Sequence, residues 1–162
     1  MRPLLPSLLA AFAFATASSA FAHVTVSNPW ARATVAQQQA SGVFMDLRSA
    51  HDDAQLVGVK SDAASTAEVH EMRMEDNVMK MRAVPSVKLP NGQAVSLKPG
   101  GYHIMLMGLK KPLVAGENVD LTLEVVHADG AKESIAVSAP IRALAPAAAG
   151  QPAAAGGHQH QH

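Results

Sequence analysis

Short runs of valine, leucine and other apolar residues recur along the chain between turn residues, and they constrain its fold more than any other feature. Runs of about four to eight residues bounded by Gly, Pro, Asn and Asp are typical of strands in a β-sandwich. The pattern predicts strands at residues 24–27, 42–47, 56–61, 68–74, 78–84, 94–97, 102–107, 119–127 and 133–137. The sequence has no amphipathic helical pattern of useful length, so it predicts an all-β sandwich.

The two ends of the chain differ in composition from its middle. Residues 1–22 combine a positive charge at Arg2, an apolar stretch and the small-residue sequence Ala20-Phe21-Ala22, as a cleaved secretory signal does. Residues 144–162 are rich in Ala, Pro, Gly and Gln and have little apolar bulk to offset the entropy cost of ordering, so we expect a disordered tail. Residues 23–143 remain as one domain of ordinary size.

The composition of the chain restricts its cellular compartment and the classes of partner and site that it can have. The signal predicts export, with the periplasm as the expected compartment, and no later stretch approaches the roughly 18 apolar residues that a membrane helix needs. With 13 basic and 13 acidic residues the formal net charge is zero, which gives nucleic acid no electrostatic attraction. The chain has no cysteine, which excludes a disulfide framework, a thiolate zinc site and a catalytic thiol.

Two histidines and two methionines stand at spacings that suit a metal site. They follow the pattern His-x10-Met-x21-His-x-Met and are His70, Met81, His103 and Met105. Thioether sulfur and neutral imidazole are donors that the soft ion Cu(I) accepts, and a chain without cysteine has few other soft donors. Four neutral ligands leave the single charge of Cu(I) in place, which favours it over the harder ion Cu(II). We therefore predict these four residues as Cu(I) ligands.

The expected strands place these side chains on common faces, because successive side chains of a strand point to opposite faces. His70 and Met72 therefore share one face. If Asp76-Asn77 forms a two-residue hairpin loop, Met72 pairs with Met81, and His70 becomes a diagonal neighbour of Met81. The other two predicted ligands share a face of a third strand. The cluster is complete if that strand lies beside the hairpin.

The same residue types also have a simpler structural interpretation. Methionine commonly fills gaps in a core. Core packing and a methionine-rich rim of the site are the two interpretations that stay open for Met72, Met74, Met79 and Met107. Taken singly, His70 and His103 would be ordinary structural histidines. The single tryptophan, Trp30, is expected in the core. We predict no function for His51 or His127.

The C-terminal tail carries a second candidate metal-binding sequence. Alternating histidines on a flexible chain suit Cu(II), Ni(II) or Zn(II), and those of the tail are His158, His160 and His162. Cleavage after Ala22 also gives His23 a free amine beside its imidazole, which is a donor pair for Cu(II). The alternative for the tail is a solubilising extension.

Around the predicted ligands the chain resembles the periplasmic copper chaperones known as the PCuAC family. The matching sequences are AEVHEM at 67–72, MKMR at 79–82, LKPGGYHIMLMGL at 97–109, and VTVS and WARAT near the start of the mature chain. The resemblance covers essentially the whole mature domain.

This resemblance implies a cupredoxin-like Greek-key β-sandwich that carries one Cu(I) on the family's ligands, which match His70, Met81, His103 and Met105. It also implies delivery of copper to the copper-bearing subunit of a haem–copper cytochrome oxidase, often beside a Sco-type assembly protein. The histidine tail departs from many members, which end soon after the last strand, and it implies additional uptake of Cu(II).

The sequence leaves three classes of function to compare. The leading hypothesis is a binding protein rather than an enzyme, namely a monomeric periplasmic copper chaperone. The alternative keeps the metal but makes the protein a copper buffer or resistance protein that stores Cu(II) on its tail. A copper redox enzyme is disfavoured, because electron transfer on this type of fold usually relies on a Cys ligand. The sequence also carries no nucleophile elbow, phosphate loop or zinc-hydrolase motif.

Overall fold

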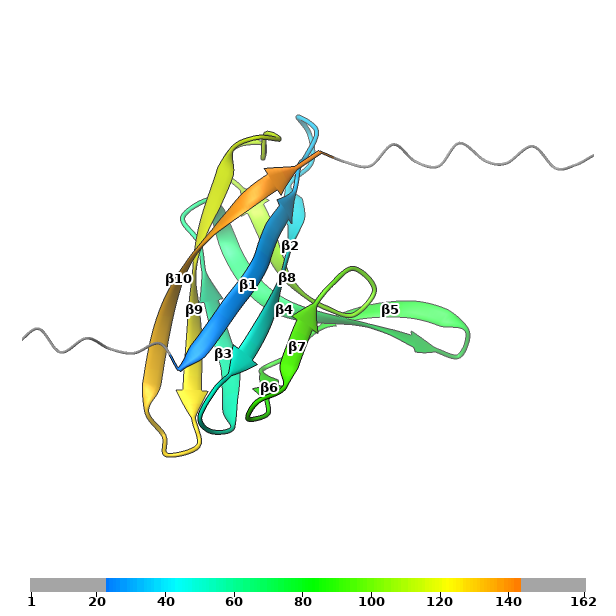
Figure 1. The fold of residues 1–162 in the computed structure, drawn as a ribbon. Coiled ribbons are helices and arrows are strands. Elements are labelled where there is room, and N and C mark those ends of the chain that lie inside the picture. The colour runs from blue at the N-terminus through cyan, green and yellow to red at the C-terminus, as the bar shows by residue number, and fades with distance from the viewer. Residues whose placement is uncertain (1–22, 144–162) are drawn as a thin grey trace, which may run out of the picture.

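The computed structural model describes residues 23–143, and these form ten strands and no helix (Figure 1). The strands are β1 (Val24–Arg32), β2 (Ala40–Ser49), β3 (Ala54–Lys60), β4 (Ala64–Glu75), β5 (Val78–Ala83), β6 (Val87–Leu89), β7 (Ala94–Leu97), β8 (Tyr102–Leu109), β9 (Asn118–His127) and β10 (Lys132–Arg142). The predicted all-β class is confirmed. Within the described range no helix is long and apolar enough to cross a membrane. The predicted signal and tail lie outside the described residues.

The strands form one continuous sheet that folds over into two layers. Its order is β5-β4-β8-β2-β1-β10-β9-β3-β6, and β7 also pairs with β2. The junction between the layers is a short parallel pairing of β1 with β10, at Ala31↔Ile141 and Arg32↔Arg142. One layer therefore contains β1, β2, β4, β5, β7 and β8, and the other contains β3, β6, β9 and β10. Figure 1 shows the layers as two sides of a sandwich.

The core lies between the layers and fixes which side chains of each strand face outward. Ile104 and Leu106 of β8 and Leu123 of β9 have no exposed surface. Burial of each such side chain contributes about 1.5–3 kcal/mol to folding. Because Ile104 and Leu106 point inward, the alternating residues His103 and Met105 point to the outer face of the sheet.

The β4–β5 hairpin projects from the sandwich (Figure 1). Its two loop residues, Asp76 and Asn77, have φ angles of 51° and 62°. Positive φ at both central residues is what a type I′ turn requires, and Asn and Asp tolerate it better than most residues. The strands pair in the predicted register, with Met72 opposite Met81 and Met74 opposite Met79. The turn chemistry therefore sets the faces that β4 and β5 present.

Two features differ from the sequence prediction. The three-residue strand β6 was not predicted, because it is too short to show a period and is flanked by Pro85 and Pro90. The prediction that Trp30 lies in the core is wrong, since Trp30 is only half-buried, on the outer face. A bulge shifts the register of β1 against β2 between Ser27 and Trp30, and Asn28 there has a φ of 51°. This shift turns Ala31 into the core instead of Trp30.

Candidate metal centre

The neighbouring strands β4 and β8 place the two predicted histidine ligands opposite each other. In their antiparallel register His70 pairs with His103, and Glu68 pairs with Met105. The imidazole centroids of His70 and His103 are 6.0 Å apart. A metal bound to a ring nitrogen lies about 3 Å from the ring centroid, since the metal–nitrogen distance is about 2.0–2.1 Å. One ion between the two rings therefore fits this separation.

The two predicted methionine ligands share a hollow with His103. Met105 lies two residues further along β8, and Met81 of β5 is one diagonal step from His70. His103, Met81, Met105 and Met72 line a hollow of about 290 Å3. His70 is not among its lining residues; it is 9% exposed, and its ring lies beside that of His103. The structure thus brings three predicted ligands into one hollow and places the fourth next to it.

Hydrogen bonds set which nitrogen of each imidazole is free. His70 Nε2 lies 3.1 Å from Glu68 Oε2, and His103 Nδ1 lies 3.1 Å from the carbonyl oxygen of Gly101. A carboxylate and a carbonyl only accept hydrogen bonds, so in the neutral rings these two nitrogens carry the hydrogen. The lone pairs are then on His70 Nδ1 and His103 Nε2. A carboxylate or carbonyl on the far nitrogen is also the usual arrangement around a metal-bound histidine.

His70 Nδ1 is a buried polar atom with no hydrogen-bond partner among the described residues. Leaving such an atom unsatisfied costs about 1–3 kcal/mol. A metal ion that accepts its lone pair removes this penalty. The donor set around it contains neutral imidazole and thioether groups and suits a soft, singly charged ion such as Cu(I).

Two aromatic rings form a wall beside His103. The Phe44 ring of β2 lies 6.3 Å from the His103 ring, and the Trp30 ring lies 4.4 Å from that of Phe44. The guanidinium of Arg142 is 5.2 Å from the Trp30 ring centroid, within range of a cation–π contact. Phe44 was not predicted as a site residue. The alternation Gly42-Val43-Phe44 predicts that Val43 and Phe44 lie on opposite faces of β2. It places Phe44 beside His103 only when β2 is known to pair with β8.

Gly42 leaves the space that the Phe44 ring occupies. A Cβ atom at residue 42 would lie 2.8 Å from Phe44 Cζ, closer than such atoms approach. We expect Gly42→Ala to displace this ring, to lower the free energy of unfolding by about 1–3 kcal/mol, and to weaken metal binding at His103 several-fold. Thermal unfolding followed by the fluorescence of Trp30 measures the first effect, and metal titration measures the second.

The matched control is Gly101→Ala, because a Cβ atom there meets only ordinary contacts at 3.8 Å. Its unfolding midpoint is expected to change much less. Equal midpoints for the two variants would contradict the role of Gly42 in positioning Phe44.

The β4–β5 hairpin has one methionine-rich face and one charged face. Met74 is 58% exposed, Met79 is 45% exposed and Met81 is 48% exposed. Core packing is therefore wrong for Met74 and Met79, and their role as a rim of the site stays a prediction. On the opposite face Arg82 Nη2 lies 3.3 Å from Glu71 Oε2. Of these three exposed methionines, Met81 lines the hollow beside His103.

A second group of nitrogen and oxygen donors surrounds His127, whose side chain is 4% exposed. Its Nδ1 lies 3.0 Å from Asp52 Oδ1, and its Nε2 lies 2.9 Å from Glu133 Oε2. Burial alone would lower the pKa of His127, but the hydrogen bonds with these carboxylates outweigh it and raise that pKa above its ordinary value. The hydrogen bond with His127 holds the pKa of Asp52 below its ordinary value.

His23, a predicted secondary ligand, lies in this second group, with its ring centroid 5.2 Å from that of His127. His127 itself was given no function from the sequence, because its partner Asp52 lies 75 residues away along the chain. The other predicted secondary ligands, His158, His160 and His162, lie outside the described residues.

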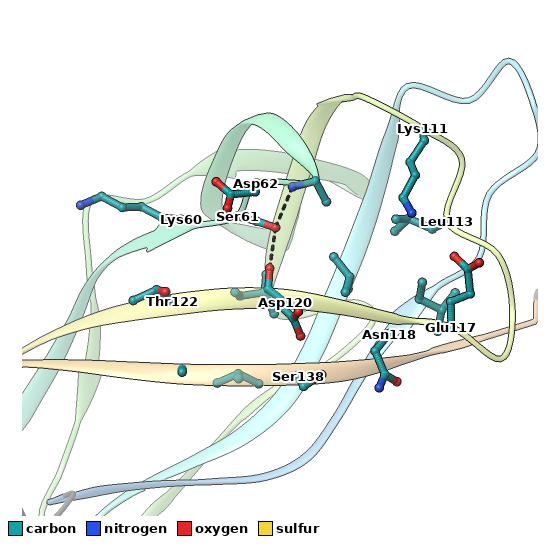
Figure 2. Close-up of a pocket in the computed structure, with 16 residues that line it drawn as sticks. Lys60, Ser61, Asp62, Lys111, Leu113, Glu117, Asn118, Asp120, Thr122 and Ser138 are labelled. Atoms are coloured by element: carbon teal, nitrogen blue, oxygen red, sulfur yellow. Dashed lines mark hydrogen bonds between the residues drawn. The ribbon is translucent and has the colours of Figure 1, made fainter.

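Another hollow lies away from both groups of donors. It measures about 740 Å3 and is lined mainly by the β3–β4 turn, β9 and β10 (Figure 2). Its polar lining mixes Lys60 with Asp62 and Glu117. Ser61 Oγ donates a hydrogen bond of 2.6 Å to the carbonyl oxygen of Asp120, as Figure 2 shows. None of the predicted ligands lines this hollow, so it adds no donor to the metal centre.

Sequence comparison relates the chain to lipoproteins. A family model described as "Putative lipoprotein LpqE-like" matches residues 24–141. The protein "Putative lipoprotein Lxx21020" of Leifsonia xyli subsp. xyli is 41% identical over 83 residues, which are 51% of this chain and 49% of that protein. The chain thus spans about half the length of this curated relative.

Structural comparison finds the same fold in a PCuAC domain and in the protein DR1885. The copper-bound PCuAC domain from PmoF2 superimposes with a TM-score of 0.61 at 21% identity, covering 76% of this chain and 95% of that domain. Apo-DR1885 from Deinococcus radiodurans gives a TM-score of 0.58 at 27% identity, covering 89% of this chain and 95% of the other. Its CuI form gives 0.56 at 26% identity, with 78% and 83% covered. The expected cupredoxin-like sandwich is confirmed.

Proposed function

The chain belongs to the family described as "Putative lipoprotein LpqE-like", and from this premise we propose that it is a copper chaperone. It holds Cu(I) on His70, Met81, His103 and Met105 and releases the ion to an acceptor protein. Copper-bound forms of a PmoF2 domain and of DR1885 have been solved with this fold, and they support copper as the cargo.

The observation that carries the proposal is that His70, whose ring lies beside that of His103, has a buried Nδ1 atom without a hydrogen-bond partner among the described residues. A structural histidine in that position would have a hydrogen-bond partner, because an unsatisfied buried acceptor costs stability. Glu68 orients the ring so that this lone pair is free. Met81 and Met105 then supply soft donors in the adjoining hollow.

The proposed histidine and methionine ligands differ in burial, and this difference favours transfer of Cu(I) to an acceptor protein. The two histidines are buried, while Met81 is 48% exposed on the projecting hairpin. An acceptor ligand therefore reaches the ion first from the side of Met81 and replaces that weakly bound thioether before the imidazoles. The ion passes as Cu(I) throughout, so the exchange needs no electron donor or acceptor. Thioethers bind no proton at ordinary pH, which leaves acid sensitivity to the histidines alone.

The cellular role in this proposal is delivery of copper in the periplasm, to the copper-bearing subunit of a cytochrome oxidase or to a Sco-type assembly protein. The lipoprotein descriptions of the family and of the Leifsonia relative support an exported protein. The protein acts as a carrier rather than an enzyme, and as a monomer. A strain that lacks it is expected to lose oxidase activity at limiting copper and to keep its copper tolerance.

The direct test is a titration of the full chain with Cu(I) in the presence of a competing chelator. We expect one Cu(I) per chain, and an X-ray absorption spectrum with both sulfur and nitrogen neighbours around copper. Failure of the protein to take Cu(I) from any chelator, or a spectrum without sulfur neighbours, would reject the proposal.

A copper buffer or resistance protein is the alternative, and the histidines at 158, 160 and 162 favour it. Storage predicts several copper ions per chain under excess metal, whereas delivery predicts one or two. A deletion strain that loses copper tolerance but keeps full oxidase activity would favour storage.

A further inference from the structure

Three imidazoles and two carboxylates meet at the end of the sandwich where β1 begins. His23 directly precedes β1, and His51 and Asp52 lie in the turn between β2 and β3. His127 is the last residue of β9, and Glu133 lies near the start of β10. Figure 1 shows these strand ends together at the lower end of the molecule, away from the β4–β5 hairpin. The Cu(I) proposal uses none of these residues.

Three of these side chains have ligand atoms within reach of one ion. A ring nitrogen of His23, a ring nitrogen of His127 and a carboxylate oxygen of Asp52 all lie within 4.8 Å of one another. Two ligand atoms bound to one ion at about 2.0–2.2 Å are at most about 4.4 Å apart. Small side-chain rotations therefore suffice to bring all three to one ion.

Backbone contacts hold the segments that carry these ligands. The amide of Ala50 donates to the carbonyl oxygen of His23 at 3.0 Å. Ser49 Oγ donates to the carbonyl oxygen of Asp52 at 2.6 Å, and the amide of Ala128 donates to Asp52 Oδ2 at 3.3 Å. The three ligand segments are thus fixed to one another before any ion binds, which lowers the ordering cost of binding.

Glu133 contacts both histidines of the cluster, His127 and His23. Its Oε2 atom is 2.9 Å from His127 Nε2, and its Oε1 atom accepts a hydrogen bond of 3.1 Å from the backbone amide of His23. With Nε2 held by Glu133, His127 presents Nδ1 toward Asp52. A carboxylate on the far nitrogen is the usual partner of a metal-bound histidine. His127 is buried and His23 is exposed, so the cluster combines a fixed ligand with an open side for entry of an ion.

We propose that His23, Asp52 and His127 form a second metal site, for a divalent ion that prefers nitrogen and oxygen donors, Cu(II) or Zn(II). The cluster contains no sulfur, unlike the hollow around Met81 and Met105, so the two sites select different ions. The two carboxylates favour a doubly charged cation. At a nitrogen and oxygen site of this kind Cu(II) binds more tightly than Zn(II).

The second site holds its own ion and does not share the Cu(I) of the first. Trp30, part of the aromatic wall of the first site, is seven residues along the chain from His23, which corresponds to roughly 20 Å of strand. No single ion bridges that distance. The proposal therefore stands or fails independently of the proposed Cu(I) chaperone function.

The test uses the full chain with the tail histidines removed by His158→Ala, His160→Ala and His162→Ala. Cu(II) binding is followed by electron paramagnetic resonance and Zn(II) binding by calorimetry. We expect one Cu(II) with nitrogen and oxygen ligands, and weaker binding of one Zn(II). His23→Ala and Asp52→Asn are each expected to lower the affinity at least about 10-fold.

The matched control is the double variant Met81→Leu, Met105→Leu, which is expected to leave Cu(II) affinity unchanged. Because His127 is buried and its replacement risks unfolding, the exposed residue His23 provides the decisive variant, and its unfolding midpoint is measured in parallel. Binding that survives both His23→Ala and Asp52→Asn overturns the proposal. The absence of any binding of Cu(II) and Zn(II) by the chain without tail histidines also overturns it.

Discussion

Replacement of Met81 and Met105 together by leucine is expected to lower the affinity of the protein for Cu(I) at least about 100-fold. Loss of a hydrogen-bond partner of a metal ligand costs about 10–100-fold in affinity, and this variant removes two direct ligands. Leucine has nearly the volume of methionine, so the change in stability is expected to stay below about 1.5 kcal/mol. Competition with a Cu(I) chelator measures the affinity, and thermal unfolding checks the fold.

The control for this prediction is the double variant Met74→Leu, Met79→Leu on the same hairpin. These two residues are exposed and pair with each other, but neither lines the hollow beside His103. Their replacement is expected to change Cu(I) affinity by less than about 3-fold. If both double variants weaken Cu(I) binding equally, the exposed methionines bind copper without a defined ligand pair. If neither variant weakens it, the proposed ligand set is wrong.

The geometry of the hairpin follows from sequence because it depends on local chemistry. Asp76 and Asn77 tolerate the positive φ angles of a tight turn, and this turn alone sets the pairing of Met72 with Met81. The alternation of β8 in the same way determines that His103 and Met105 share a face. The pairing of β4 with β8 joins segments more than 30 residues apart. The spacing of the four predicted ligands indicates this pairing only if one assumes that they bind a common metal ion.

The parts of the site that were not predicted depend on contacts between distant segments. A bulge at Asn28-Pro29 in β1 turns Trp30 outward. Proline within a strand is a sign of an edge strand or a bulge, but it does not show how the register of β1 against β2 shifts. Phe44 becomes a wall of the site only through the order of the strands. The group around His127 combines residues of three separate turns and strand ends. Sequence periodicity describes each strand by itself, so it cannot show which strand ends meet.

The burial of a single atom is the property that sequence predicts least well. At His70 this property distinguishes a metal ligand from a structural histidine. Glu68 and His70 lie on the same face of β4, which allows the carboxylate to bind Nε2. The His103 ring of the neighbouring strand β8 lies 6.0 Å from the His70 ring, and His70 Nδ1 is buried without a hydrogen-bond partner among the described residues. The fold therefore keeps a destabilising atom at the place where an ion is proposed to bind.

His70→Leu is accordingly expected to abolish Cu(I) binding and, at the same time, to stabilise the metal-free protein. Leucine removes the unsatisfied Nδ1 atom, whose burial costs about 1–3 kcal/mol, and it leaves Glu68 able to turn toward water because that side chain is 44% exposed. A gain of about 1 kcal/mol corresponds to roughly 4 °C in the unfolding midpoint of a domain of this size. Calorimetric unfolding with and without Cu(I) measures both effects.

His103→Leu provides the contrast. It is also expected to abolish Cu(I) binding. It removes the hydrogen bond that His103 Nδ1 donates to the carbonyl oxygen of Gly101 and eliminates no buried unpartnered atom, so no stabilisation follows. Wild-type protein saturated with Cu(I) at about 1,000 times its Kd gains about 4 kcal/mol from binding, and both variants lose that gain. A metal-free His70→Leu protein less stable than wild type would show that His70 is a satisfied structural residue, and copper would then have to bind elsewhere.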